Sequence, residues 1–235
     1  HLSEDSMIEY SIDDNIAIIE IDNGKYNSLG SKELNSIINI IEDINKNGTV
    51  LGIIITGTDD YFCSGFDLAE MLEFQTKDEI ISFMKIADKA FVSVFSCQKP
   101  VIAALNGSTI AAGFLLSMAA DYRYISYNKR IKLGLSEVKF GLSIWAVHTE
   151  ILKFSLNQKL IKKLAYEGEL LNITDAMQEN VIDAVISEES LLQYSKNKIQ
   201  EIMSYPGNPF SYIKRSNKLT TINKIETIKN YDQSN

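Results

Sequence analysis

The sequence contains few of the residues on which several common kinds of site depend. Its 235 residues include two cysteines, Cys63 and Cys97, and two histidines, His1 and His148. Two irregularly placed cysteines do not make a disulfide framework or a zinc site, so we expect no metal site and a reducing, cytoplasmic location. With so little histidine, a nucleophilic triad that depends on a histidine base is not expected.

Long apolar runs and excess positive charge are also missing. No run approaches the roughly 18 apolar residues that a membrane-spanning helix needs. The net charge of -8 and the isoelectric point near 4.9 argue against a general binder of nucleic acid or membrane surfaces, because both favour basic patches. We therefore expect neither as a partner. Residues 1–6 are polar, lack the order of a secretory signal, and are expected to be a disordered lead or a tag remnant.

The sequence does contain a regular alternation of strand and helix patterns. With 45% apolar residues and no repeats or low-complexity linkers, the chain suits one globular domain, or one domain with a small appendage. The predicted strands are 16–21, 52–56, 101–105, 122–126 and 131–135. The predicted helices are 31–45 with Ser31 as its cap, a short one starting near 67, 77–95, 113–120, 144–154, 157–166, 174–180, 188–204 and 208–230. This order predicts an α/β core with a C-terminal helical layer.

Two separated segments combine a buried strand, a turn of small residues and a helix start. The first turn, 61–68, follows the strand that ends at Thr56, and the second, 106–113, follows the strand that ends at Leu105. Where a strand gives way to a helix, backbone N–H groups lack intrahelical acceptors and can stabilise developing negative charge. Small residues there let a ligand approach the main chain closely. Together the two turns predict an oxyanion hole and hence an acyl-thioester enzyme.

The order of the motifs resembles the crotonase superfamily, also called the enoyl-CoA hydratase/isomerase family. The similarity spans roughly residues 16–189. The motifs that carry it are KYNSL at 25–29, IITG at 54–57 followed by FCSGFDL at 62–68, KPVIAALNG at 99–107 followed by AAGFLLSMAADYR at 111–123, LGLSEVKFGL at 133–142 and YEGELLNITDAMQENVIDAVI at 166–186. Their joint occurrence in this order is far more specific than any single glycine pattern.

This resemblance implies a spiral core of ββα units over 7–187. It also implies a C-terminal helical region over 188–235, shortened relative to similar proteins, that takes part in trimer assembly. The implied partners are an acyl-CoA or acyl-carrier-protein thioester and further copies of the chain, in a homotrimer or hexamer. Coenzyme A or phosphopantetheine would enter as part of the substrate, and no separate cofactor is expected.

The resemblance also implies where the site lies. Two backbone N–H groups hold the thioester oxygen in this family, and by position they fall on Ser64 and Gly113. Contacts to the substrate or to coenzyme A fall on a further set of positions: Lys25, Asn27, Ser28, Leu29, Gly65, Phe66, Asp67, Leu68, Leu115 and Ser136.

Two positions separate the chemistries of the family. Hydratases that it resembles use two glutamates, and the first of these positions falls on Leu115, which cannot activate water. The second is present as Glu137. This combination resembles the Δ3,Δ2-enoyl-CoA isomerase branch, in which one base removes a proton from the α carbon of a 3-enoyl thioester and returns it at the γ carbon. The resemblance therefore implies an isomerase with Glu137 as its catalytic residue.

Alternatives remain open at this stage. One glutamate and an oxyanion hole also suit a decarboxylase, hydratase or hydrolase acting on CoA or carrier-protein thioesters in polyketide or fatty-acid biosynthesis. A non-catalytic assembly subunit is a further alternative. Asp67 fits a helix N-cap better than a second carboxylate, and His148 fits a packed position on a helix. Residues 142–148 are bulkier than the glycine-rich loop of the family, so the length of the acyl chain does not carry over.

Overall fold

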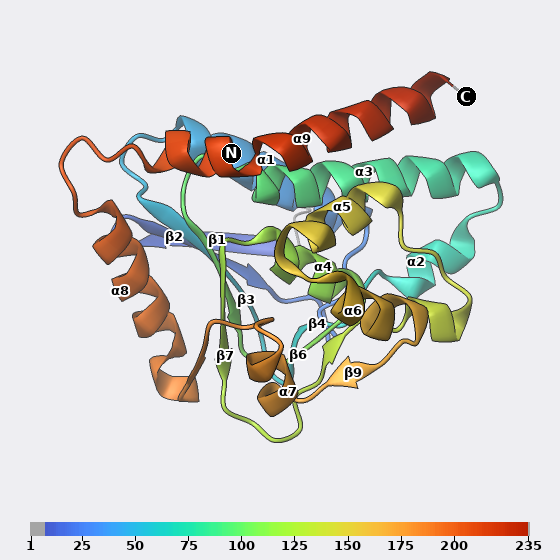
Figure 1. Ribbon diagram of the computed structural model, residues 1–235, viewed down its shortest axis with the longest axis horizontal. Helices are drawn as coiled ribbons and strands as arrows, with labels where there is room; N and C mark the ends of the chain where they lie inside the picture. Colours follow the sequence, from blue (N-terminus) through green and yellow to red (C-terminus); the bar gives the residue numbers. More distant parts are fainter. Residues whose placement is uncertain (1–7, 235) are drawn as a thin grey trace.

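A six-stranded sheet forms the centre of the chain (Figure 1). The computed structural model describes residues 8–234, and the lead expected at 1–6 lies outside them. The strands stand in the order β1-β2-β3-β5-β7-β10. Their bounds are β1 Ile8–Asp13, β2 Ile16–Ile21, β3 Gly52–Gly57, β5 Val101–Leu105, β7 Tyr122–Ser126 and β10 Ala184–Ile186. β1 pairs with β2 antiparallel, and the other neighbouring strands are parallel.

Segments that connect the strands of this sheet form a second, four-stranded sheet. Its strands, in spatial order, are β4 Tyr61–Cys63, β6 Ser108–Ile110, β8 Leu133–Gly134 and β9 Leu170–Leu171. The first three are parallel, and β9 is antiparallel to β8. β4 follows β3, β6 follows β5 and β8 follows β7, and a helical segment comes next each time. The predicted α/β spiral of ββα units is therefore confirmed.

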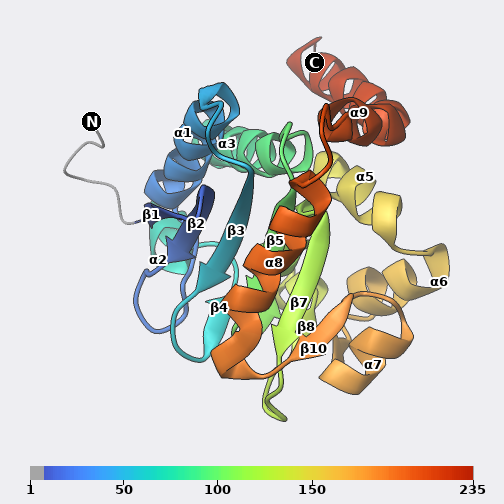
Figure 2. The same ribbon diagram turned by 90° about the vertical axis from the view of Figure 1, so that its left-hand side faces the viewer.

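Helices cover both faces of the long sheet (Figure 2). Their bounds are α1 Ser31–Lys46, α2 Leu68–Glu73, α3 Lys77–Phe95, α4 Ala112–Ala119, α5 Ala146–Ser155, α6 Gln158–Ile161, α7 Ile173–Gln178, α8 Leu191–Met203 and α9 Phe210–Ser234, with the short 3₁₀ or π segments η1 Glu137–Phe140, η2 Lys162–Tyr166 and η3 Glu188–Ser190. Successive strand side chains point to opposite faces. In β3, Ile53 and Ile55 therefore join the main core, whereas Ile54 packs in the cluster under α8.

The elements that differ from the sequence prediction are mostly short. α3 spans the residues predicted for it. Of the predicted strand 131–135, only the two residues of β8 are in a strand, and the predicted helix 157–166 changes from an α-helix to a π-helix at Lys162. The strands β4, β6, β9 and β10 were not predicted, because each has only two or three residues and such a length shows no periodicity. β1 was also missed; its side chains beyond Ile8 are largely exposed, which leaves little apolar pattern.

The prediction that Ser31 caps the first helix is wrong. Gly30 occupies the N-cap position of α1, and its N–H donates to the carboxylate of Glu33 at 2.9 Å. Ser31 is the first helical residue, and its hydroxyl and N–H groups both donate to the carboxylate of Glu70. Since Glu70 belongs to α2, the start of α1 depends on a tertiary contact that the local sequence does not show.

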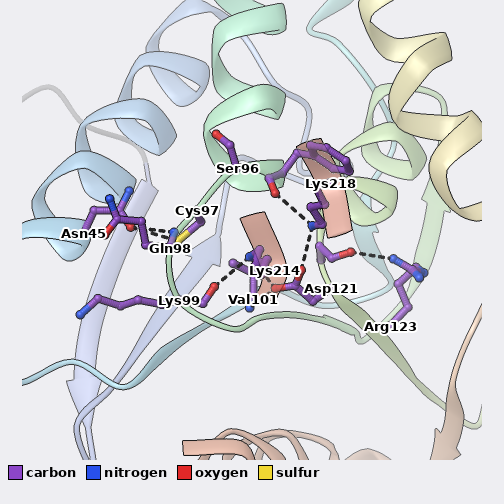
Figure 3. Close-up of polar contacts among 12 residues, drawn as sticks. Asn45, Ser96, Cys97, Gln98, Lys99, Val101, Asp121, Arg123, Lys214 and Lys218 are labelled. Carbon is purple, nitrogen blue, oxygen red and sulfur yellow. Dashed lines mark hydrogen bonds and ion pairs between the residues drawn. The ribbon is translucent and has the colours of Figure 1, made fainter. Parts of the chain in front are cut away.

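The last helix, α9, is fastened to the core by two buried lysines that share one carboxylate (Figure 3). The Lys214 ammonium donates to Asp121 Oδ2 at 2.6 Å and to the carbonyl of Lys99 at 2.9 Å. The Lys218 ammonium donates to Asp121 Oδ1 at 2.8 Å and to the carbonyl of Phe95 at 3.0 Å. Burial lowers the pKa of Lys218 to about 8, against the attraction of Asp121. α9 thus covers the ends of α3 and β5 in the same chain.

Candidate active site

Three neighbouring strands of the four-stranded sheet end at the same edge of that sheet. The segment that follows each strand carries a residue that the sequence predicts to belong to the site. β4, β6 and β8 are parallel neighbours, so their carboxyl ends meet at one edge. The segments 64–66, 111–113 and 135–137 leave from that edge. The Ala111 N–H donates to the carbonyl of Gly134 at 2.9 Å, which joins the second segment to the third. Ligands commonly bind outside the carboxyl ends of parallel strands.

The first two of these segments are in direct contact, and glycine is needed at both. A Cβ built on Gly113 would lie 2.2 Å from the carbonyl oxygen of Cys63, which leaves no space for a side chain. A Cβ built on Gly65 would lie 3.1 Å from the Cβ of Ala111 and 3.7 Å from the nitrogen of Ala112. Gly65 also has a φ of +127°, which L-residues rarely adopt. The two turns therefore approach each other at the level of the main chain, a contact that the sequence did not predict.

The N–H of Phe66 is available to a ligand. The residues on either side of Phe66 form backbone hydrogen bonds with Leu29. The carbonyl of Gly65 accepts from the Leu29 N–H at 2.8 Å, and the Asp67 N–H donates to the Leu29 carbonyl at 2.9 Å. In this parallel bridge the N–H of Phe66 points away from Leu29. Among residues 8–230, no acceptor bonds to it. Phe66 therefore carries a free N–H on the first turn.

The start of α4 supplies donors on the second turn. The first hydrogen bond within this helix runs from the Leu115 N–H to the carbonyl of Ala111, at 3.0 Å. The N–H groups of Ala112 and Gly113 precede it and have no partner within the described chain, as is usual in a first helical turn. The predicted donor Gly113 is therefore unpaired, and Ala112 lies beside it, facing Gly65.

The prediction that the N–H of Ser64 holds the thioester oxygen is wrong. This N–H donates to the carbonyl of Tyr26 at 3.0 Å and so is not available to a substrate. The sequence places the end of the strand correctly, but it does not show that the chain at Tyr26 lies alongside. Gly65 was the signal that could have identified Phe66, because a positive φ at a glycine redirects the N–H groups that follow it.

Glu137 lies on the third segment, as the first residue of η1. Its side chain is buried, and its Oε2 atom has no hydrogen-bond partner among the described residues. Burial raises the pKa of this carboxyl, while the backbone N–H groups of Glu137 and Ser136 and the nearby charge of His148 act in the opposite direction. A buried carboxyl with a raised pKa is suited to accepting and returning a proton.

The other predicted contact residues fall into two groups. Asn27 and Leu29 are fully buried and hold the turns together: the Asn27 amide donates to the carbonyls of Thr58 and Tyr61, at 2.9 and 2.8 Å. The carbonyl of Ser28 accepts from Asn23. Asp67 is occupied as the N-cap of α2, where it accepts from the N–H groups of Ala69 and Glu70. These residues shape the turns through their own hydrogen bonds.

The second group lies at the surface or in the core. Leu68 is 61% exposed at the start of α2. Lys25 lines a polar cavity of about 530 Å³ together with Asp59, Asp60 and Glu188, whose charges would oppose the approach of a phosphate. Leu115 is buried in the main core on α4, a helix without any ionisable side chain. Ser136 is the N-cap of η1 without a side-chain capping bond.

His148 is buried and packed, as predicted, but the structure adds a partner that the sequence did not indicate. Its Nε2 atom lies 2.8 Å from Oδ1 of Asp88, a buried residue of α3. Within residues 8–234, no three His, Cys, Asp or Glu side chains are arranged to hold a metal ion. Nor does any helix of this described range combine the length and apolar composition needed to cross a bilayer.

Comparison with known proteins agrees with this geometry. The family model described as enoyl-CoA hydratase/isomerase matches residues 11–234. Enoyl-CoA delta isomerase 1 from Homo sapiens mitochondria is 22% identical over 99% of this chain and 77% of its own length. Crotonyl-CoA hydratase from Syntrophomonas wolfei is 29% identical over 82% of this chain and 74% of its own.

A solved structure shares the fold. The crystal structure of human mitochondrial delta3-delta2-enoyl-CoA isomerase superimposes with a TM-score of 0.89 at 21% identity, covering 97% of this chain and 89% of that one. The match of the family model to nearly the whole chain establishes the family. This chain belongs to the enoyl-CoA hydratase/isomerase family, whose members act on acyl-CoA thioesters.

Proposed function

We propose that this protein shifts the double bond of a 3-enoyl thioester to the 2-position, with Glu137 as its single acid–base group. The observation that carries the proposal is the unpaired, buried Oε2 of Glu137 at the edge where the free N–H groups also lie. The other carboxylate at this edge, Asp67, is already occupied as a helix cap. α4 supplies no carboxylate, since its residues are all uncharged. One base is sufficient for a 1,3-proton shift.

The proposed reaction has two steps. The Glu137 carboxylate removes a proton from the α carbon, and the electron pair moves into a dienolate whose negative charge lies largely on the thioester oxygen. The N–H groups of Phe66 and of the first turn of α4 stabilise that charge. The protonated Glu137 then returns the proton at the γ carbon, which leaves the 2-enoyl thioester and regenerates the carboxylate. No atom is gained or lost.

The environment of Glu137 suits this role. Burial raises the pKa of the carboxyl, which brings it nearer to the range in which a group both accepts and donates protons at neutral pH. The same burial excludes water from the dienolate, so that protonation comes from Glu137. The rate should accordingly fall as the pH drops through the raised pKa and the base is lost.

Hydration of a 2-enoyl thioester is the second candidate, because relatives such as crotonyl-CoA hydratase are hydratases by name. The absence of a carboxylate on α4 favours isomerisation over it. A panel of 2-enoyl, 3-enoyl and malonyl-type thioesters, each on coenzyme A and on a carrier protein, separates the reactions by mass and NMR. We expect a 3-enoyl thioester to change its NMR spectrum without a change in mass. A mass gain of one water from a 2-enoyl thioester, or no turnover of any member, would overturn the proposal.

We further propose that the protein assembles as a homotrimer or a hexamer of the same chains. Exposed apolar side chains on α8 and α9, among them Leu192, Tyr212 and Ile213, offer surface for such contacts. Mass photometry at micromolar concentration should show a trimer or a hexamer. A monomer under those conditions would contradict the assembly without affecting the proposed chemistry.

A further inference from the structure

A cavity of about 490 Å³ lies between the end of α3 and the beginning of α9, and none of the candidate active-site residues lines it. Its volume is within the range of small-molecule sites. Three cations line it, Lys214, Arg215 and Lys218, and no carboxylate side chain is among its described lining residues. The whole chain carries a net charge of -8, so this concentration of positive charge does not follow from the composition.

Two of these cations are buried with a single carboxylate between them (Figure 3). The side chains of Lys214 and Lys218 are 6% and 4% exposed, and their ammonium groups bind the two oxygens of Asp121. One carboxylate neutralises one ammonium, so the three groups together keep an excess positive charge. Burial lowers the pKa of Lys218 to about 8, which still leaves its ammonium mostly protonated at neutral pH. A buried charge without a counter-charge is costly, so a further anion here would stabilise the fold.

All three cations retain donors for a ligand. A lysine ammonium has three N–H donors, and Lys214 and Lys218 each have two hydrogen-bond acceptors among the described residues. The Lys218 ammonium also lies 4.2 Å from the centroid of the Phe95 ring, whose attraction is weaker than that of an oxygen anion. The guanidinium of Arg215 takes part in none of the ion pairs of the described chain.

The rest of the cavity wall is compatible with an anion. The side chains of Gln98 and Ser211 line the cavity and have no hydrogen-bond partner within the described residues, so each can donate an N–H or O–H group. α3 ends at Phe95 and α9 begins at Phe210, so the partial charges of the two helix ends, about -0.5 and +0.5, largely cancel here. The preference of the cavity for an anion therefore comes from the three cations.

We propose that this cavity binds a phosphate-type oxyanion, held by the ammonium groups of Lys214 and Lys218 and the guanidinium of Arg215. The three cations and Asp121 together carry two positive charges, and a phosphate monoester carries about -1.5 to -2 at pH 7. Its several oxygens accept charge-assisted hydrogen bonds from more than one cation at once, which a single chloride ion cannot divide among separate atoms. Since both lysines belong to α9, a bound anion would strengthen the attachment of this helix to the core.

Calorimetry and ³¹P NMR on the full chain test this site, at neutral pH and at an ionic strength held constant with sodium chloride. The probes are inorganic phosphate, diphosphate and adenosine monophosphate, which differ in charge and in the group attached to the phosphate. We expect at least one probe to bind saturably with a Kd of about 1 mM or tighter, and to raise Tm as its concentration rises. The probe that binds most tightly distinguishes a free phosphate from the phosphate end of a nucleotide.

Two variants connect binding to the cations of the cavity. Arg215→Glu reverses the charge of an exposed side chain, so the protein should fold while Kd rises at least about tenfold. Lys218→Met leaves Lys214 and Asp121 as a one-to-one pair and should raise Kd by a similar factor. Lys224→Glu is the matched control, because it makes the same change in charge at an exposed position of α9 that does not line the cavity. Kd should change less than about twofold in this control.

Three results would each overturn the site: no probe that binds saturably with a Kd of about 1 mM or tighter, an unchanged Kd in folded Arg215→Glu, or an equal loss of affinity in Lys224→Glu. If Lys218→Met fails to fold, Arg215→Glu decides the question, because its exposed side chain forms none of the ion pairs that hold α9. Absence of isomerase activity would refute only the proposed function, since none of these cations takes part in the proposed reaction.

Discussion

The backbone N–H of Ser64 donates to the carbonyl of Tyr26 at 3.0 Å, and this bond decides which residue of the first turn can face a substrate. It ties the end of β4 to the turn that precedes α1. The chain then passes through Gly65 at positive φ, and the next N–H, of Phe66, is left without an acceptor in the described structure. A contact between segments almost forty residues apart therefore determines which N–H group of this turn is free to act as the proposed oxyanion donor.

The close contact between the two turns predicts that Gly113→Ala is damaging. The new Cβ would lie 2.2 Å from the carbonyl of Cys63, so β4 or α4 must shift. We expect a loss of about 1–3 kcal/mol in the free energy of unfolding and a fall in kcat of at least tenfold, because the N–H donors move apart. Urea denaturation and isomerase assays measure the two effects. Gly48→Ala, with no atom within 4 Å of its new Cβ, should change neither; full activity in Gly113→Ala would contradict the assigned donors.

Glu137→Gln should abolish turnover. The amide keeps the shape of the side chain and removes the base, so kcat is expected to fall by about three decades or more while thioester binding changes little. Steady-state kinetics and calorimetric binding of a thioester give the two numbers. Glu150→Gln is the matched control elsewhere in the fold. Wild-type turnover in Glu137→Gln would remove this residue from the mechanism.

The same substitution should raise stability, with a defined pH dependence. Burial raises the pKa of Glu137 above its ordinary value of 4.5, so the folded state favours the protonated form and ionisation costs stability. Wild-type stability therefore falls as the pH rises from about 4.5 through the raised pKa, whereas glutamine does not titrate. Thermal unfolding should give Glu137→Gln a higher Tm than the wild type at neutral pH and an equal one near pH 4. A difference in Tm between Glu137→Gln and the wild type that grows towards acid pH would contradict this prediction.

Leu115→Glu tests whether the missing carboxylate alone prevents hydration. Leu115 lies on α4 in the buried core, two residues beyond Gly113. A glutamate there would restore a two-carboxylate pattern, and we expect measurable hydration of a 2-enoyl thioester where the parent shows little or none. The buried acid would also cost a few kcal/mol of stability, so folding must be checked by circular dichroism. A folded variant without hydratase activity would mean that water access or substrate pose also separates the two reactions.

Asp121→Asn should loosen α9. The change leaves the ammonium groups of Lys214 and Lys218 buried without their shared counter-charge. We expect a loss of about 3–5 kcal/mol in the free energy of unfolding, the usual cost of breaking a buried ion pair from one side. Faster proteolysis in the connection between α8 and α9 would show which part opens. As a control, Asp43→Asn at an exposed position should leave the free energy of unfolding unchanged. An Asp121→Asn protein as stable as the wild type would show that these ion pairs do not hold α9.

The sequence by itself determined the elements with a long apolar period and the segments with strong local geometry. Ile53, Ile54 and Ile55 specify a strand buried on both faces, and the capping box at Thr76 fixes the start of α3. The small residues around Gly65 and Gly113 indicated two turns that let a ligand approach the main chain closely, and the resemblance of the surrounding motif to the crotonase superfamily indicated Glu137 as the base. These features depend on residues adjacent in the chain, whose conformational preferences act locally.

Only the tertiary structure decided which groups of the site are free and which are occupied. The pairing of Ser64 with Tyr26, the capping of α1 by Glu70 and the contact of Asp88 with His148 all join segments far apart in sequence. A hydrogen bond or ion pair of this kind depends on distances of about 3 Å set by packing of whole elements, and no local propensity encodes them. The spiral that brings the ends of β4, β6 and β8 to one edge supplies those distances.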